Sequence, residues 1–424
     1  MPIRCLACLF ALIVRIGFIS ADDWPQWRGP NRDAVWHEDG ILKSFPAGGL
    51  KFLWRVPVHE GFSSPIVVQG RVYLTDVELT YPNPKERVLC FDAATGQPLW
   101  THAYPAAYED YGPENPTMGP ISTPICAGGK LYSVGYSELH CRDAASGNLL
   151  WKKELDKEYG SQPRLSWASP LIEGQHLIIY SGRLSEDPVD CLIAIDKDSG
   201  QTVWRAIKDF SAASSPIVVS AAGKRQVIVW SQQAVTAVDA ATGQILWREA
   251  TRPENQSSVV ATPVTHGSQL LIAALMMELD QTQPAAKVLW PESKSPARRN
   301  FSMTGSPMLR GDLVFSGRTS GELVCLDAAT GDQLWSDEKV TELGRGATIH
   351  LTAHGDETFL YTDRGELIIA RLDRDGCHEV SRTKVLEPTY PFSGSKFAWA
   401  PPAFANRCLF ARSDKELVCA SLAE

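Results

Sequence analysis

From residue 50 to residue 422 the chain alternates short apolar runs with turns rich in glycine and proline. A typical run, Ile66–Val68, is followed by Gln69-Gly70 and then by a second run over residues 71–75. Glycine at such a turn supplies the positive φ that a tight hairpin needs. This range shows no apolar repeat with the 3.6-residue period of an amphipathic helix, so short strands joined by hairpins are predicted.

One segment recurs five times with fixed spacing. In each copy a small residue, an aspartate, a glycine and a tryptophan occupy positions 1, 3, 7 and 11; the copies are Cys90–Trp100, Cys141–Trp151, Ala194–Trp204, Ala237–Trp247 and Cys325–Trp335. A repeat of this kind indicates that one supersecondary unit has been copied along the chain.

A second signal opens each repeat. A serine or threonine followed by proline starts a short apolar run at residues 64–65, 123–124, 169–170, 215–216, 262–263 and 306–307. Pro401-Pro402 is a degenerate copy, and the run over residues 348–352 fills the remaining gap without its proline.

The tryptophans fix the register of the whole repeat. They stand at Trp54, Trp100, Trp151, Trp204, Trp247, Trp290 and Trp335, with a degenerate position near Val380, and the gaps between them are 43 to 53 residues. A period of this length suits four strands per unit and a β-propeller. Each indole is predicted to lie flat between adjacent blades as a structural docking residue, and each aspartate to accept N–H bonds within its own turn.

The two ends of the repeat region are incomplete. Residues 50–56 form a tryptophan strand with no first three strands before it, and residues 400–422 form three strands with no tryptophan strand after them. Joined, they make one blade and leave no open sheet edge. The sequence therefore predicts an all-β fold: an eight-bladed β-propeller of four-stranded antiparallel blades, spanning residues 50–424, whose last blade is closed by the N-terminal strand.

Residues 1–21 have the pattern of a signal peptide, and residues 22–49 form a leader without repeat character. Arg4 precedes a mostly apolar stretch that ends in small residues before Asp22, which predicts cleavage and a periplasmic or secreted protein; Arg15 interrupts the stretch, so an uncleaved anchor stays open. No transmembrane span is expected after cleavage. Losing Arg4 and Arg15 changes the net charge from −8 to −10, and such a surface does not favour nucleic acid as a partner.

The cysteines give no sign of a metal site. Cys90, Cys141, Cys325 and Cys419 share the small position that alanine fills in other repeats, which favours packing beside a tryptophan, although a Cys408–Cys419 disulfide stays open. No CxxC, HExxH or EF-hand pattern occurs.

The Ala/Cys-x-Asp-x-x-Thr/Ser-Gly-x-x-x-Trp segment resembles the docking motif of pyrroloquinoline-quinone (PQQ) propeller repeats. The leader Asp23–Asp33, with sequence DWPQWRGPNRD, is similar to the start of secreted bacterial PQQ-like repeat proteins. The resemblance extends to the BamB-like propellers of outer-membrane protein assembly, which implies a non-catalytic scaffold. It also covers quinone-dependent dehydrogenases, whose adjacent cysteine pair this chain lacks. We therefore expect no cofactor and no catalytic residue, with PQQ and calcium as the alternative.

Chain direction places second-to-third turns and blade-to-blade crossovers on one loop-rich face of the ring. Candidate binding residues there are Tyr104 and Tyr108 in the crossover 101–121, Trp399 in the crossover 381–399, and four arginines predicted to surround one mouth: Arg183, Arg318, Arg364 and Arg412. Solvated hairpin arginines and aromatics that pack within the ring are the structural alternatives.

These features favour an extracytoplasmic scaffold for a protein or another envelope polymer. A PQQ-dependent alcohol or sugar dehydrogenase and a carbohydrate-binding module are the other hypotheses. An enzyme is the less favoured class, because no catalytic set is recognisable in the sequence.

Overall fold

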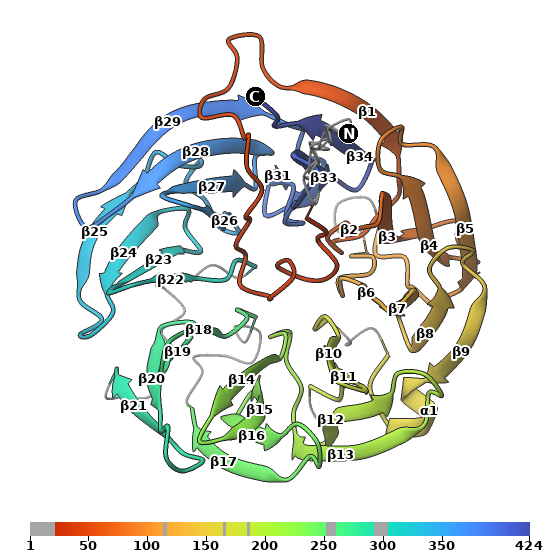
Figure 1. Cartoon of the computed structure of the whole chain (residues 1–424). Coiled ribbons are helices and arrows are strands. Elements are labelled where there is room, and N and C mark those ends of the chain that lie inside the picture. Colours follow the sequence, from red (N-terminus) through yellow and green to blue (C-terminus); the bar gives the residue numbers. More distant parts are fainter. Residues whose placement is uncertain (1–21, 113–116, 164–166, 185–186, 252–259, 292–303) are drawn as a thin grey trace, which may run out of the picture.

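The computed structural model describes residues 22–112, 117–163, 167–184, 187–251, 260–291 and 304–424. Eight four-stranded antiparallel sheets surround a central axis, as the sequence predicts (Figure 1). The single α-helix in the described residues, α1 (Leu155–Tyr159), belongs to a crossover. None of the described helical structure is long and apolar enough to cross a membrane.

The first four blades follow the chain in order. Blade one contains β2 (Ile66–Val68), β3 (Arg71–Glu78), β4 (Lys85–Asp92) and β5 (Pro98–Pro105). Blade two contains β6 (Ile125–Ala127), β7 (Lys130–Val134), β8 (Glu138–Asp143) and β9 (Leu149–Glu154). Blade three contains β10 (Leu171–Glu173), β11 (His176–Tyr180), β12 (Val189–Asp196) and β13 (Thr202–Asp209). Blade four contains β14 (Ile217–Ala221), β15 (Lys224–Trp230), β16 (Ala234–Asp239) and β17 (Ile245–Ala250).

Three further blades repeat this plan. Blade five contains β18 (Val264–His266), β19 (Gln269–Ile272), β20 (Leu275–Leu279) and β21 (Ala286–Trp290). Blade six contains β22 (Met308–Arg310), β23 (Leu313–Gly317), β24 (Leu323–Asp327) and β25 (Gln333–Asp337). Blade seven contains β26 (Ile349–His354), β27 (Glu357–Thr362), β28 (Glu366–Leu372) and β29 (Cys377–Lys384).

The eighth blade joins the two ends of the repeat region. Its C-terminal strands β32 (Ala403–Ala405), β33 (Cys408–Arg412) and β34 (Glu416–Ser421) are completed by β1 (Lys51–Pro57). β1 and β34 run antiparallel, with Trp54 opposite Cys419. The predicted closure by the N-terminal strand is confirmed.

Several docking tryptophans lie against the turn of the next blade. The Trp54 Nε1–H donates to the Ala93 carbonyl at 2.9 Å, and a Cβ added to Gly96 would lie 2.7 Å from the indole. The same arrangement joins Trp100 to Ala144 and Gly147, Trp151 to Lys197 and Gly200, and Trp290 to Ala328 and Gly331. The motif glycine therefore supplies both a left-handed φ and the space for the preceding blade's indole.

Hydroxyl-mediated hydrogen bonds join neighbouring blades near the axis. The residues before the repeated prolines form this hydroxyl belt: Ser64, Thr123, Ser169, Ser215, Thr262 and Ser306. The N–H of Ser64 donates to Thr123 Oγ1, that of Thr123 to Ser169 Oγ and that of Ser169 to Ser215 Oγ, each at 3.0 Å. The Thr262 N–H donates to Ser306 Oγ at 3.1 Å. The Ser/Thr-Pro signal thus marks the inner contact between blades, as tryptophan marks the outer one.

Blade seven has no docking tryptophan. Ser381 occupies that strand position, because it pairs with Ile369 immediately before the bulge, and Val380 is the extra residue of the bulge. Blade eight has no covalent turn between its third and fourth strands to receive an indole, because β34 pairs with β1 from the other end of the repeat region. The leader lies there instead: the Phe45 N–H donates to Ser381 Oγ at 2.9 Å, and the Glu424 N–H donates to the Gly40 carbonyl at 3.0 Å.

Two glycine substitutions separate backbone strain from indole docking. Gly70 (φ 74°) and Gly96 (φ 72°) have the same backbone conformation, but an added Cβ meets nothing within 4 Å at Gly70 and meets Trp54 at Gly96. We expect Gly70→Ala to lower the free energy of unfolding by about 1–2 kcal/mol. Gly96→Ala should cost a further 1–3 kcal/mol or so, because the added methyl overpacks the indole. Urea unfolding of both variants tests this, and equal losses would contradict the docking role.

Candidate functional site

The leader crosses the middle of the ring of blades (Figure 1). Trp24 forms an antiparallel bridge with Val67 in blade one, and the Trp27 Nε1–H donates to Thr262 Oγ1 at 2.9 Å, beside blade five. Arg32 Nη1 donates to the Pro170 carbonyl at 2.7 Å, beside blade three. These contacts hold the Trp27 side chain across the axis, on the side of the ring where first and second strands are joined.

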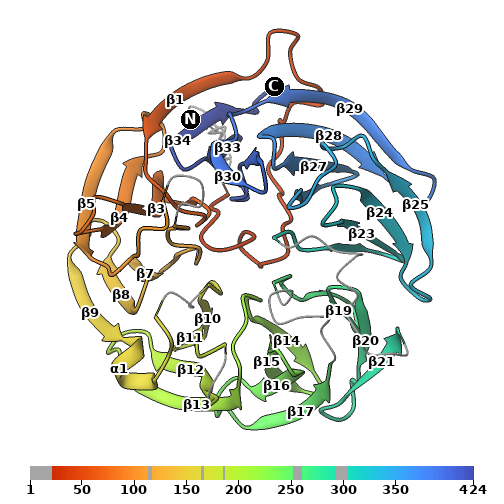
Figure 2. The ribbon, with the colours of Figure 1, turned by 180° about the vertical axis from the view of Figure 1, so that it is seen from behind.

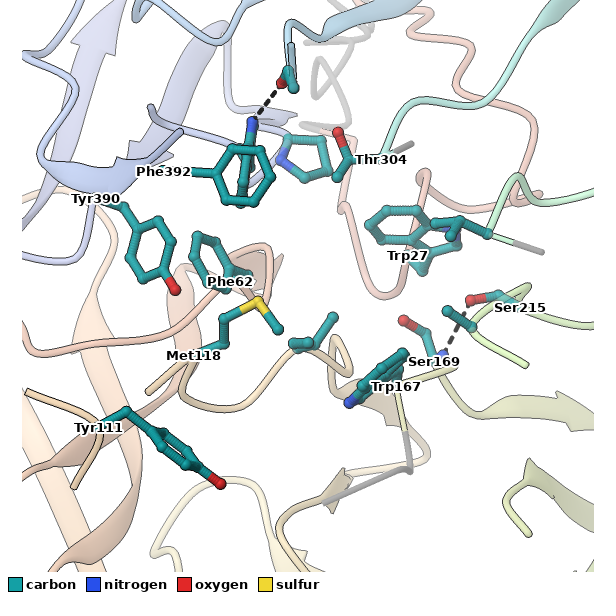
Figure 3. A pocket seen from close by; sticks show the side chains of 16 residues that line it. Trp27, Phe62, Tyr111, Met118, Trp167, Ser169, Ser215, Thr304, Tyr390 and Phe392 are labelled. Carbon is teal, nitrogen blue, oxygen red and sulfur yellow. Dashed lines mark hydrogen bonds between the residues drawn. The ribbon is translucent and has the colours of Figure 1, made fainter. Parts of the chain in front are cut away.

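A cavity of about 470 Å³ lies at Trp27, on the loop-rich side of the leader (Figure 3). Every blade-to-blade crossover contributes to its lining, which comprises Trp27, Phe62, Tyr111, Met118, Ile121, Trp167, Ser169, Ala213, Ser215, Val260, Thr304, Gly346, Tyr390, Phe392, Trp399 and Pro401. None of these described lining residues is charged. The volume is within the range of small-molecule pockets and of pockets that receive one or two large side chains.

One wall of the cavity is a packed aromatic cluster. The hairpin of β30 (Tyr390–Phe392) and β31 (Ser395–Phe397) lies at the inner edge of the ring, as the view from behind shows (Figure 2). Phe62 contacts Tyr390 edge-on with ring centroids 4.8 Å apart, and Phe392 contacts Trp399 at 4.9 Å. The Trp399 Nε1–H donates to the Gly346 carbonyl at 2.8 Å. The wall is therefore held in place before any ligand binds.

The polar part of the lining consists of hydroxyls. Ser169 Oγ and Ser215 Oγ each accept a backbone N–H from the preceding blade, and each hydroxyl proton can still turn toward a ligand. Together with the aromatic faces, they suit a ligand that has apolar faces and a few hydrogen-bond acceptors. Among the described lining residues there is no nucleophile paired with a general base.

A family model described as outer membrane protein assembly factor BamB matches residues 84–337 and 278–379, which together exceed half of the chain. The chain belongs to the BamB family. No curated protein sequence matches it.

Solved structures show the same fold at low identity. BamB from Moraxella catarrhalis is 17% identical with a TM-score of 0.56, covering 88% of this chain and 97% of that chain. Quinohemoprotein alcohol dehydrogenase from Comamonas testosteroni is 14% identical with a TM-score of 0.68, covering 95% and 80%. A europium-containing methanol dehydrogenase is 12% identical with a TM-score of 0.60, covering 93% and 89%. BamB and two dehydrogenases share this propeller, so function has to be argued from the site.

In this BamB-family propeller the three predicted aromatic residues have different surroundings. Trp399 lines the cavity. Tyr108 is buried and donates its hydroxyl to Glu86 Oε1 at 2.7 Å, and Tyr104 lies edge-on to His140 with centroids 4.3 Å apart. Burial raises the pKa of Glu86 and raises the pKa of Tyr104 well above its ordinary value. The two tyrosines thus belong to a buried cluster between blades one and two.

The four predicted arginines are not among the described residues that line the cavity. Arg412 is fully buried and donates to the Thr75 carbonyl at 3.0 Å, and burial lowers its pKa to about 10. The guanidinium of Arg364 lies 4.9 Å from the ring centroid of Phe397 and 3.3 Å from Asp363 Oδ2. Arg183 donates to the Gly160 carbonyl, and Arg318 donates to Gln333 Oε1. Each of the four arginines thus contacts another residue of the ring.

The cavity residues that sequence reasoning missed follow a positional rule. Six of them, like the predicted Trp399, stand three residues before the second member of the Ser/Thr/Pro-Pro pair that opens each blade: Phe62, Ile121, Trp167, Ala213, Val260 and Thr304. In blade seven, Gly346 stands three residues before Ile349, which replaces the proline. Reading that one position in every repeat would have outlined the cavity. Trp27 has no such signal, because its place depends on how the leader crosses the ring.

His350 links the aromatic wall to blade seven. Its lowered pKa makes the stability of the fold depend on pH. Its Nε2 lies 2.8 Å from the Trp399 carbonyl, and burial lowers its pKa to about 4. Since the unfolded histidine titrates near 6.5, the unfolded chain binds the extra proton between about pH 6.5 and pH 4, and stability falls as pH decreases through that window.

We expect this histidine alone to remove about 2 kcal/mol of stability between pH 7 and pH 5. Urea unfolding at the two pH values should show His350→Gln losing about that much less than the parent chain. His266→Gln, at an exposed histidine, is the control and should match the parent. An undiminished pH dependence in His350→Gln would refute the assignment.

Proposed function

We propose that this BamB-family propeller is a non-catalytic binding scaffold of the cell envelope, and that it holds a protein partner on its loop-rich face. The observation that carries the proposal is the aromatic cavity on the axis, to which every crossover contributes. Aromatic anchors in a preformed concave site are the usual energetic centre of a protein interface. The proposed periplasmic or secreted location rests on residues 1–21, which lie outside the described residues.

The partner would insert one or two large apolar side chains from a loop or strand. A cavity of about 470 Å³ offers room for such a group, and its aromatic wall is already packed. Tyr111 is 47% exposed at the cavity and would extend the contact outward. Because the pocket is organised in advance, little conformational entropy is lost there on binding.

A PQQ cofactor with calcium does not fit the described lining. Calcium is held mainly by carboxylate and carbonyl oxygens, whereas no described residue of the cavity carries a carboxylate. The described part of the chain also contains no group of three His, Cys, Asp or Glu side chains that could hold a metal ion. The proposal therefore assigns no redox step to this site.

Carbohydrate is the second candidate ligand, because three indoles and several hydroxyls line the same cavity. Trp27, Trp167 and Trp399 offer flat apolar faces to a sugar ring, and Ser169 and Ser215 offer hydrogen-bond donors. A carbohydrate would contact the same cavity residues as a protein partner. A binding assay with defined peptide and glycan probes therefore separates the two hypotheses.

Binding of defined probes to Trp167→Ala tests the cavity. Peptides displaying Phe, Tyr or Trp and a glycan array would be presented to the folded full-length protein after removal of any signal peptide. We expect aromatic peptides to bind. Trp167→Ala should weaken their affinity about 30-fold, which corresponds to the loss of an anchor residue that contributes about 2 kcal/mol.

Leu149→Ala is the matched control, because Leu149 is 47% exposed on the outer strand β9. Peptide binding that survives Trp167→Ala would contradict the cavity as anchor. Glycan binding alone would replace the protein partner by a carbohydrate. Dye reduction with an alcohol after reconstitution with quinone and calcium would overturn the non-catalytic assignment.

A further inference from the structure

A second cavity, of about 610 Å³, lies on the opposite side of the leader. Leader residues between Gln26 and Val35 form one side of it, and the innermost strands β10, β14, β18 and β22 form the other. Figure 1 shows the leader arching across the ring opposite these strands. Trp27 borders the aromatic cavity and Arg28 borders this one, so neighbouring leader residues face two separate sites.

Arginines give the second cavity an excess of positive charge. Arg28, Arg32, Arg225 and Arg310 line it together with Asp33 and Glu173, so four positive and two negative groups leave +2 with histidine neutral. The whole chain carries −8. Arg225 is neutralised locally, because its Nη2 lies 2.7 Å from Glu173 Oε2.

The other three guanidinium groups contact only neutral acceptors. Arg28 donates to the carbonyls of Arg32 and Asp33, both at 3.2 Å. Arg32 donates to the carbonyls of Ser169 and Pro170 and to Gln26 Oε1. Arg310 Nη2 donates to Thr358 Oγ1 at 3.0 Å and to the Glu357 carbonyl. Across the described ranges of the chain, no carboxylate forms an ion pair with any of these three groups.

Holding these charges without a direct ion pair is unfavourable: Asp33 raises the pKa of Arg28 and Asp356 that of Arg310, but by less than burial lowers them. Burial lowers the pKa of Arg28 to about 10, and burial together with the charge of Arg28 lowers the pKa of Arg32 to about 9. Burial lowers the pKa of Arg310 in the same direction. An anion in the cavity would stabilise the three charged guanidinium groups and so compensate for the hydration that they lose on burial.

We infer that this second cavity binds a small polyvalent anion carrying carboxylate or phosphate groups, with Arg28 and Arg310 donating to it and Arg32 adding positive charge. The volume is that of a small-molecule pocket rather than of a macromolecular surface. Arginine is suited to both kinds of oxyanion through paired N–H donors. The inference is independent of the proposed function, because it concerns the opposite side of the leader.

Calorimetric titration of the full-length protein with citrate and with inorganic pyrophosphate tests the site and separates its two oxyanion chemistries. Glycerol serves as the neutral control. We expect saturable binding of at least one anion, with an affinity that falls as salt concentration rises. Arg28→Gln and Arg310→Gln should each weaken the affinity about tenfold or more, as expected for loss of a charge-assisted hydrogen bond. Arg32 is left unchanged because its hydrogen bonds to the Ser169 and Pro170 carbonyls hold the leader against blade three.

Arg374→Gln is the matched control, because Arg374 is exposed, paired with Asp312 and Asp327, and not among the residues that line the cavity. Circular dichroism and thermal unfolding establish that each variant is folded. Absence of saturable binding for both anions at millimolar concentration would overturn the inference. So would equal weakening by Arg374→Gln, or weakening by Trp167→Ala without any effect of Arg28→Gln and Arg310→Gln, since that result would place the anion in the aromatic cavity.

Discussion

The contact between an indole and the glycine turn of the next blade is the interaction on which the ring depends. Trp54 lies where a side chain at Gly96 would lie, and its N–H is satisfied by the Ala93 carbonyl. Glycine and tryptophan of one motif copy therefore serve different interfaces: the glycine receives the preceding blade, and the tryptophan reaches the following one. This explains why the two residues recur together although they do not contact each other within a blade.

The absence of a docking tryptophan from blade seven has a topological cause. A tryptophan on β29 would have to dock onto a turn between the third and fourth strands of blade eight, and no such covalent turn exists because β34 and β1 come from opposite ends of the repeat region. Ser381 stands at that position and bonds to the leader at Phe45. The degenerate repeat and the leader contact are thus two consequences of closing a ring with a linear chain.

The fold could be predicted from sequence because its determinants are local and repeated. The spacing of Asp, Gly and Trp, the Ser/Thr-Pro openings and the two incomplete ends were sufficient for blade number and closure. The binding site was harder to predict, because a residue that recurs in several repeats can serve contacts within the ring or contacts with a ligand. Arg412 recurs with Arg364, yet it is buried against backbone carbonyls. Trp399 was recognised as a candidate, whereas Trp27 and Arg28 acquire their places through leader contacts with residues far away in sequence.

Closure by β1 also bears on the order in which the ring is assembled during synthesis. β34, which pairs with β1, is synthesised after the other blades. β1 therefore lacks its pairing partner while almost the entire propeller is translated. Trp54 docks onto blade one, whose turn at Ala93–Gly96 is made soon after β1. Blade one can therefore hold β1 in place through Trp54. The last three strands, β32, β33 and β34, then add to β1, which is already in position. The entropic cost of bringing the distant ends together is thereby shared with a contact that forms early.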